Sequence, residues 1–228
     1  MGGFIFDYGG TLDTGGCHWG QHIWHAYERA GIPVAEALYR EAYVHAERTL
    51  VREPLIQPNF TFYDTLRTKL AIQFRYLSAQ GLQGDVEVMR SAVLEDLYAQ
   101  TMRHTSHSRE VLLCLAERCP LVLVSNFYGN IHTVLHEFHF DGLFRHVIES
   151  AVVGVRKPNP QIFSLGVEAL GLQPEEVTIV GDSLDKDILP ALQAGCQAVW
   201  LRGEQWTAES SAAIPPVRII TDLCDLLS

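Results

Sequence analysis

The stretch FIFDYGGTLD, residues 4–13, joins a short apolar run to a polar loop that contains two adjacent glycines. The apolar run 4–6 predicts a strand that ends at Asp7, because continuous apolar runs are typical of strands buried on both faces of a parallel sheet. Gly9 and Gly10 let the backbone come close to an anion, and exposed N–H groups in such a loop can bind one. This stretch therefore predicts a strand followed by an anion-binding loop.

Two later apolar runs end in the same way. LVLV at 121–124 is followed by Ser125 and Asn126, and VTIV at 177–180 is followed, after one glycine, by Asp182. Further strands are predicted at 198–201 and 217–220, and helices at 109–118, 160–170 and 184–194. Strands that alternate with helices of this length indicate βαβ units. We expect an α/β fold with a mostly parallel sheet and helices on both faces.

The residues between the first two predicted strands follow a different pattern. They are rich in helix formers at amphipathic spacing, with breaks at Pro54, Pro58 and Gly81–Gly84. This pattern predicts a helical insertion after the first strand. We expect the insertion to occupy residues 14–104 and the α/β core to consist of residues 1–13 and 105–228.

Polar residues that follow the predicted strands are candidates for a functional site. Ligands of open parallel sheets bind outside the carboxyl ends of the strands, so Asp7, Ser125 and Asp182 are expected to converge on one crevice. Lys157 precedes a stiff Pro-Asn-Pro turn and can neutralise both a carboxylate nucleophile and a transferring phosphoryl group. Asp182 and Asp187 offer hard carboxylate oxygens at a strand–helix junction, and such oxygens suit Mg²⁺.

Four segments resemble, in this order, the motifs of the haloacid dehalogenase-like hydrolase superfamily. They are FDYGGTLD at 6–13, VSN at 124–126, KPNP at 157–160 and GDSLDKD at 181–187. The helical insertion is similar to the C1-type cap of subfamily I, and the predicted core is similar to that superfamily's Rossmann-like sheet.

This resemblance implies a mechanism and a set of site residues. Asp7 would be the nucleophile, Ser125 would bind a phosphoryl oxygen, and Lys157 would steady both. The implied substrate is a small phosphorylated metabolite and the implied cofactor is Mg²⁺. The implied metal ligands are Asp7, the carbonyl of Gly9, Asp182 and Asp187, and the implied substrate contacts are Gly10, Thr11 and Asn126.

The chain departs from the family pattern at position 9. Family phosphatases usually carry a second aspartate there, two residues after the nucleophile, as general acid and base. Gly9 can offer its carbonyl to a metal but cannot transfer a proton, and such transfer typically contributes about 10²–10⁴-fold to the rate. Either another group substitutes or the phosphatase activity is weak, so we expect an aspartyl-phosphate at Asp7 that water cleaves slowly.

Two groups of residues near the loop are candidates for the general acid and base that position 9 lacks. Asp13 is close in sequence, although the direction of its side chain does not follow from the sequence. His18, His22 and His25 share one helical face if a helix begins near Cys17. A polar helix face without a catalytic role is the commoner situation for such histidines.

Other functions remain open. A haloalkanoate dehalogenase also uses an aspartate nucleophile without the second aspartate, but it works without metal, whereas this chain has Asp182 and Asp187. A phosphonatase needs a cap lysine for a Schiff base, and the only one is Lys69, while Arg52 lies near the expected position. A non-catalytic phosphate-binding protein, which has lost turnover with Gly9, is a further alternative.

The composition argues against several other classes. The 228-residue chain has a formal net charge of −10 and few lysines, so its surface should repel nucleic acids and anionic lipids. No signal peptide is visible, and no run approaches the roughly 18 apolar residues that span a bilayer. Five cysteines without a C-x-x-C pair fit a reducing compartment. We expect a cytoplasmic protein that binds neither nucleic acid nor membrane, and the sequence leaves the oligomeric state undetermined.

Overall fold

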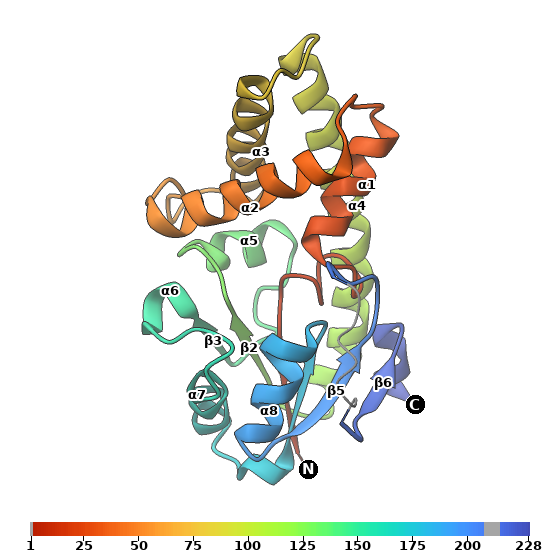
Figure 1. The fold of residues 1–228 in the computed structure, drawn as a ribbon. Helices are drawn as coiled ribbons and strands as arrows, with labels where there is room; N and C mark the ends of the chain where they lie inside the picture. Colours follow the sequence, from red (N-terminus) through yellow and green to blue (C-terminus); the bar gives the residue numbers. More distant parts are fainter. Residues whose placement is uncertain (1, 208–214) are drawn as a thin grey trace.

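The computed structural model of the chain, which describes residues 2–207 and 215–228, has a parallel sheet with a group of helices above the carboxyl ends of its strands (Figure 1). The strand order is β3-β2-β1-β4-β5-β6, and all neighbouring strands are parallel. The strands are β1 (Gly3–Phe6), β2 (Leu121–Ser125), β3 (His146–Glu149), β4 (Val177–Gly181), β5 (Gln197–Leu201) and β6 (Arg218–Ile220). This topology confirms the predicted α/β fold.

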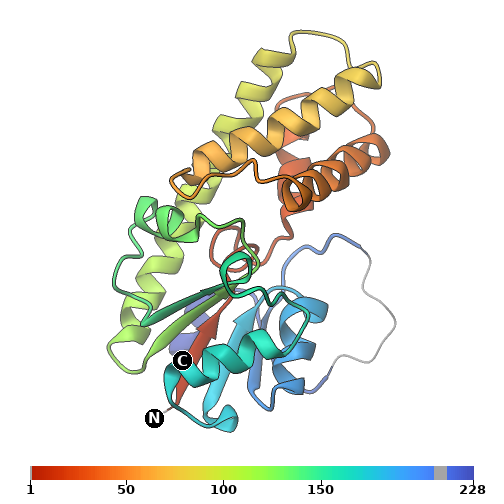
Figure 2. The ribbon, with the colours of Figure 1, turned by 90° about the vertical axis from the view of Figure 1, so that its left-hand side faces the viewer.

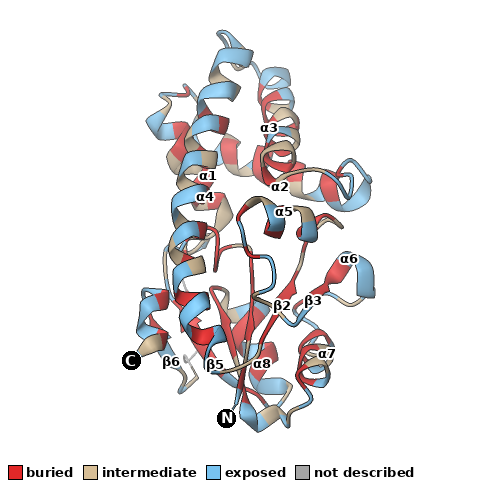
Figure 3. Cartoon of the chain, turned by 180° about the vertical axis from the view of Figure 1, so that it is seen from behind, coloured by how far each residue is buried: buried red, intermediate tan, exposed pale blue. Residues whose placement is uncertain are grey.

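Apolar cores lie on both faces of the sheet, because successive side chains of a strand point to opposite faces. Phe6 and Leu123 pack with helices α4 and α5 and with the short helix η3, whereas Ile5 and Val122 pack with α7 and α8. These helices are α4 (Val86–Ala116), α5 (Ile131–Glu137), α7 (Gln161–Leu170), α8 (Leu189–Gln193) and η3 (Leu223–Leu227). The central strands are therefore covered from both sides, and Figure 3 shows them buried.

Four helices form the group above the sheet. They are α1 (Trp19–Arg29), α2 (Glu36–Arg52), α3 (Phe62–Ala79) and the first half of α4. Helix α4 then continues downward along one face of the sheet, so it belongs to both parts of the molecule (Figures 1 and 2). No helix in the described ranges is both long enough and apolar enough to cross a membrane.

Two predicted helices differ from those observed. The pattern at 109–118 predicted a separate helix but is the end of the 31-residue α4, because residues 86–116 contain neither glycine nor proline to interrupt it. The predicted helix at 184–194 begins as a π-helical turn, η2 (Leu184–Ile188), before α8. In this turn the N–H groups of Asp187 and Ile188 both donate to the carbonyl of Ser183, which widens the first turn.

The sequence pattern did not indicate strand β3. It has only four residues, lies at the edge of the sheet, and combines His146 and Glu149 with two apolar residues, so it lacks the continuous apolar run of the central strands. The short helices α6 (Ser150–Val153) and η1 (Pro174–Glu176) complete the described elements.

Candidate active site

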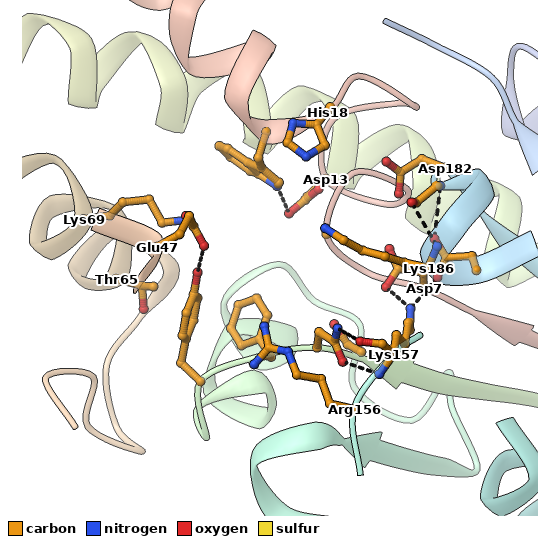
Figure 4. Close-up of a pocket in the computed structure, with 18 of the residues that line it drawn as sticks. Asp7, Asp13, His18, Glu47, Thr65, Lys69, Arg156, Lys157, Asp182 and Lys186 are labelled. Atoms are coloured by element: carbon orange, nitrogen blue, oxygen red, sulfur yellow. Dashed lines mark hydrogen bonds and ion pairs between the residues drawn. The ribbon is translucent and has the colours of Figure 1, made fainter. Parts of the chain in front are cut away.

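The carboxyl ends of three strands meet at a pocket of about 210 Å³ between the sheet and the helical group (Figure 4). Asp7 follows β1, Ser125 ends β2 and Asp182 follows β4, and all three side chains are buried and line this pocket. These strands are parallel neighbours, so their carboxyl ends lie at the same edge of the sheet. The structure thus brings together the three residues that follow the predicted strands.

Lys157 lies between two of the carboxylates. Its Nζ is 2.5 Å from Oδ1 of Asp7 and 2.7 Å from Oδ1 of Asp187, and the lysine side chain is almost completely buried. Burial opposes the charge of Lys157, but the ion pairs with Asp187 and Asp7 outweigh it and raise the pKa of the ammonium group. Lys157 is therefore a fixed cation beside Asp7.

Two residues that the resemblance assigned to substrate binding have their polar groups engaged within the protein. The side-chain amide of Asn126 donates to the carbonyl of Lys157 (3.1 Å), and its oxygen accepts from the N–H of Lys157 (3.0 Å). The N–H of Gly10 donates to Oδ1 of Asp13 at 2.7 Å. In this structure Asn126 therefore positions the loop that carries Lys157, and Gly10 holds Asp13.

Thr11 connects two carboxylates of the pocket. Its hydroxyl lies 3.1 Å from Oδ2 of Asp7 and 3.1 Å from Oδ1 of Asp182. Gly10 makes this close approach possible, because a Cβ at that position would lie about 2.5–2.6 Å from the carboxyl group of Asp182. Its φ of +99° also favours glycine.

Three buried carboxylates, those of Asp7, Asp182 and Asp187, have oxygens within 4.8 Å of one another. Burial raises the pKa of Asp7 to about 6 against the opposing effect of Lys157. Burial, together with Asp187 and Asp7, also raises the pKa of Asp182 well above its usual value. One ammonium group cannot balance three carboxylates, and hard oxygen donors suit Mg²⁺. This donor set, with the backbone of Gly9 beside it in the pocket lining, fits a divalent cation.

A second ion pair lies on the wall that the helical group contributes. Nζ of Lys69 on α3 is 2.7 Å from Glu47 on α2, and the hydroxyl of Tyr128 donates to Glu47 at 3.1 Å. Lys69 also lies over the rings of Tyr128 and Trp19. Burial by itself lowers the pKa of the Lys69 ammonium group. The interactions with Glu47 and Tyr128 have the larger combined effect and raise this pKa above its usual value.

The sequence motifs gave no site role to Glu47, Tyr128, Arg156 or Lys186, all of which line the pocket. One signal was present: the chain has only three lysines, and all three lie in this lining. Arg156 and Lys186 are exposed, and Figure 4 shows both side chains directed into the cavity.

Asp13 is also part of the pocket lining, although it is completely buried. Its second carboxylate oxygen, Oδ2, accepts a hydrogen bond from the indole Nε1 of Trp19 at 3.0 Å. Burial raises the pKa of Asp13 to about 7, although the hydrogen bonds from Gly10 and Trp19 oppose this change.

The three histidines considered from the sequence lie in different environments. His18 precedes α1, caps its first turn by accepting from the N–H of Gly20, and lines the pocket. His22 is buried outside the pocket lining, and His25 is at the surface with two glutamates. Burial lowers the pKa of His18 and His22 to about 4, so both are neutral at physiological pH.

Parts of the chain are similar in sequence to known phosphatases. A glyceraldehyde 3-phosphate phosphatase of Methanopyrus kandleri is 49% identical over 59 residues, or 26% of this chain. A phosphoserine phosphatase of Thermus thermophilus is 40% identical over 82 residues, or 34% of this chain. The chain spans only 25% and 32% of the lengths of these two relatives.

The fold itself matches solved structures along the whole chain. The structure of an L-2-haloacid dehalogenase aligns with a TM-score of 0.61 at 20% identity, covering 100% of this chain and 97% of that one. The sequence model described as haloacid dehalogenase-like hydrolase matches residues 1–195. This protein therefore belongs to the haloacid dehalogenase-like hydrolase family.

Proposed function

We propose that this protein is a Mg²⁺-dependent phosphatase that hydrolyses a small phosphorylated molecule through a phosphoryl intermediate on Asp7. The observation that carries the proposal is the position of Asp7. Its Oδ1 is paired with Lys157, and its Oδ2 lies within hydrogen-bond distance of the Thr11 hydroxyl, which is equally close to Asp182. Asp7, Lys157 and Asp182 line a pocket at the ends of three strands. The phosphatase names of the two relatives support the reaction class.

Asp7 is suited to attack phosphorus. A carboxylate oxygen forms the new bond as the bond from phosphorus to the leaving oxygen breaks, while Lys157 and the hydroxyl of Ser125 stabilise charge on the phosphoryl oxygens. Mg²⁺, held by Asp7, the Gly9 carbonyl, Asp182 and Asp187, would add positive charge beside the same oxygens. Lys157 also favours the ionised form of Asp7 that this attack requires.

The second step is attack of water on the aspartyl-phosphate. The water must lose a proton as its oxygen bonds to phosphorus, and Gly9 has no group that can accept one. A site without another proton acceptor would therefore turn over slowly, with the phosphorylated Asp7 accumulating.

We assign the helical insertion, residues 14–104, as a cap that shapes the substrate side of the pocket. It contributes Trp19, Phe62 and the Lys69–Glu47 pair to the lining, opposite the carboxylates of the α/β core at 1–13 and 105–228. The pocket volume of about 210 Å³ is suited to a small phosphorylated molecule.

The alternative reactions fit these contacts less well. A phosphonatase requires a neutral lysine that attacks an aldehyde, but Glu47 and Tyr128 hold Lys69 as an ammonium group. A metal-free dehalogenase has no divalent cation to offset the buried negative charge that Asp182 adds beside the nucleophile, whereas Asp187 is paired with Lys157.

An assay of phosphate release tests the proposed reaction. With Mg²⁺, we expect the purified protein to hydrolyse p-nitrophenyl phosphate and acetyl phosphate, because activated leaving groups need little protonation. Chelation with EDTA should remove this activity, and added Mg²⁺ should restore it. A phosphate-binding protein would release nothing, and a dehalogenase would instead release halide from 2-chloropropionate without metal.

Arg156 and Lys186 are expected to help capture an anionic substrate. In a chain of net charge −10, these exposed cations offset repulsion at the pocket, so replacing either with alanine should raise KM severalfold and leave kcat within about twofold. The effect on KM should shrink as NaCl increases, because salt screens exposed charges. Arg75→Ala is the control, since Arg75 is exposed on α3 outside the pocket lining. An equal effect of Arg75→Ala would contradict a local role.

A further inference from the structure

We propose that Asp13 is the general acid and base of this active site, taking the role that Gly9 cannot fill. This inference rests on the proposed phosphatase function. It adds a catalytic residue at a position four residues beyond the one that usually carries this aspartate in the family.

The position of the Asp13 side chain supports this role. Asp13 lies in the loop that begins at Asp7, lines the same pocket and is completely buried. Oδ1 accepts from the N–H of Gly10 and Oδ2 accepts from Nε1 of Trp19, so the carboxyl group is held from two sides. Figure 4 shows the second of these hydrogen bonds, between the indole and Asp13. A fixed carboxyl group that lines the pocket can exchange protons with a substrate bound there.

The space beside Gly9 shows why Asp13 can replace a side chain at that position. Among the described residues other than its chain neighbours, Trp19 alone comes within 4 Å of a Cβ added to Gly9, with both Cδ1 and Nε1 at 3.9 Å. The same Nε1 donates to Asp13. The carboxyl group of Asp13 and a side chain on residue 9 would therefore share Nε1 of Trp19 as a neighbour.

The proton affinity of Asp13 is suited to both directions of transfer. Burial brings its pKa to about 7, so acid and base forms are both populated near neutral pH. Of the charged groups that act on it, Asp7 raises this pKa and Lys69 of α3 lowers it. The neighbouring phenol of Tyr8 has a pKa raised by burial well above its usual value, and His18 and His22 of α1 are neutral. Asp13 is therefore the group in this set whose pKa lies closest to neutral pH.

The proposed proton transfers balance over one turnover. Protonated Asp13 gives its proton to the leaving oxygen as the Asp7–phosphorus bond forms, which releases the alcohol. Ionised Asp13 then takes a proton from the water whose oxygen attacks phosphorus. The phosphorus–Asp7 bond breaks, its electrons return to Asp7, and phosphate leaves with Asp13 protonated again.

Asp13→Asn tests the role, because asparagine retains an oxygen that can accept a hydrogen bond but cannot carry the proton. On glycerol 3-phosphate, whose alcohol is a poor leaving group, we expect kcat to fall by about 10²–10⁴-fold. On p-nitrophenyl phosphate we expect a rapid burst of p-nitrophenolate, close to the wild-type rate, followed by a slow steady state. Phosphorylated Asp7 should then accumulate and be measurable by mass spectrometry after acid quenching.

A rescue experiment separates catalysis from loop anchoring. Adding Gly9→Asp to Asp13→Asn puts a carboxylate back beside Trp19, and kcat on glycerol 3-phosphate should recover by roughly tenfold or more. Gly9→Asn in the same background is the matched control and should give no recovery. If Asp13 only anchored the loop, Gly9→Asp would raise kcat by the same factor in the wild-type and Asp13→Asn backgrounds, and this result would overturn the proposal.

A further variant, Trp19→Phe, leaves Asp13 itself in place, in case Asp13→Asn folds poorly. Trp19→Phe removes an N–H donor that lowers the pKa of Asp13, so the pH profile of dephosphorylation should shift to higher pH. An unshifted profile, or full kcat of Asp13→Asn on glycerol 3-phosphate, would contradict the proposal for Asp13 alone. Absence of any phosphoenzyme or phosphate release in the wild type would instead contradict the proposed function.

Discussion

Asp7→Asn is expected to abolish phosphate release, lowering kcat by roughly 10⁴-fold or more on every phosphate ester. The amide oxygen of asparagine is a poor nucleophile, and no other carboxylate in the cluster has the same pairing with both Lys157 and Thr11. Incubation of the wild type with a ³²P-labelled ester should label the protein on one aspartate. The variant should remain unlabelled even when p-nitrophenyl phosphate provides a good leaving group.

The fold should survive this change, because Lys157 keeps its ion pair with Asp187 when Asp7 becomes neutral. Circular dichroism and the unfolding temperature should therefore stay close to those of the wild type. Asp185→Asn is the matched control: Asp185 is exposed in η2 and lies outside the pocket lining. Undiminished steady-state hydrolysis by Asp7→Asn would remove the nucleophile assignment and with it the proposed mechanism.

Asp182→Asn is expected to remove most of the Mg²⁺-dependent activity. Losing a charged ligand should weaken metal binding by more than the roughly 10–100-fold that is typical of changes to outer-shell partners. We therefore expect a Mg²⁺ titration of activity to shift to much higher concentration, with a residual rate near that of the EDTA-treated wild type. An unchanged titration would contradict the metal assignment.

Thermal unfolding gives a readout of the same site that does not depend on catalysis. Mg²⁺ that binds only the folded state should raise the unfolding temperature of the wild type, and this increase should be small or absent in Asp182→Asn. Without metal, the variant should unfold at the same temperature as the wild type or higher, because one of three crowded, buried carboxylates has been neutralised. A lower unfolding temperature of the metal-free variant would show that the three carboxylates do not repel one another as we infer.

The sequence was sufficient for the fold class and for the residues at the strand ends. A central strand of a parallel sheet is buried on both faces, so it appears as an uninterrupted apolar run whose end is visible in the sequence. The polar residues that follow such strands, Asp7, Ser125 and Asp182, must then lie at one edge of the sheet. Strand β3 has no such run because it is short and lies at the sheet edge, and it was missed for that reason.

Other features of the site depended on contacts between residues that are distant in the sequence. Lys69 and Glu47 come from two helices whose faces meet only after the helical group is packed, and Tyr128 joins them from the loop after β2. Asn126 lines the pocket, and its side-chain amide forms two hydrogen bonds with the backbone of Lys157, 31 residues away in the sequence.

The sequence by itself therefore determined the α/β class, the order of the motifs and the absence of a carboxylate at position 9. Only the tertiary structure decided that Asp13 faces the pocket, that His22 and His25 do not, and that α4 joins the two parts of the molecule. The physical reason is that apolar periodicity records which residues are buried, whereas the direction of a polar side chain depends on its hydrogen-bond partners. For Asp13 one of those partners is the indole of Trp19, which packing of α1 brings to the carboxyl group.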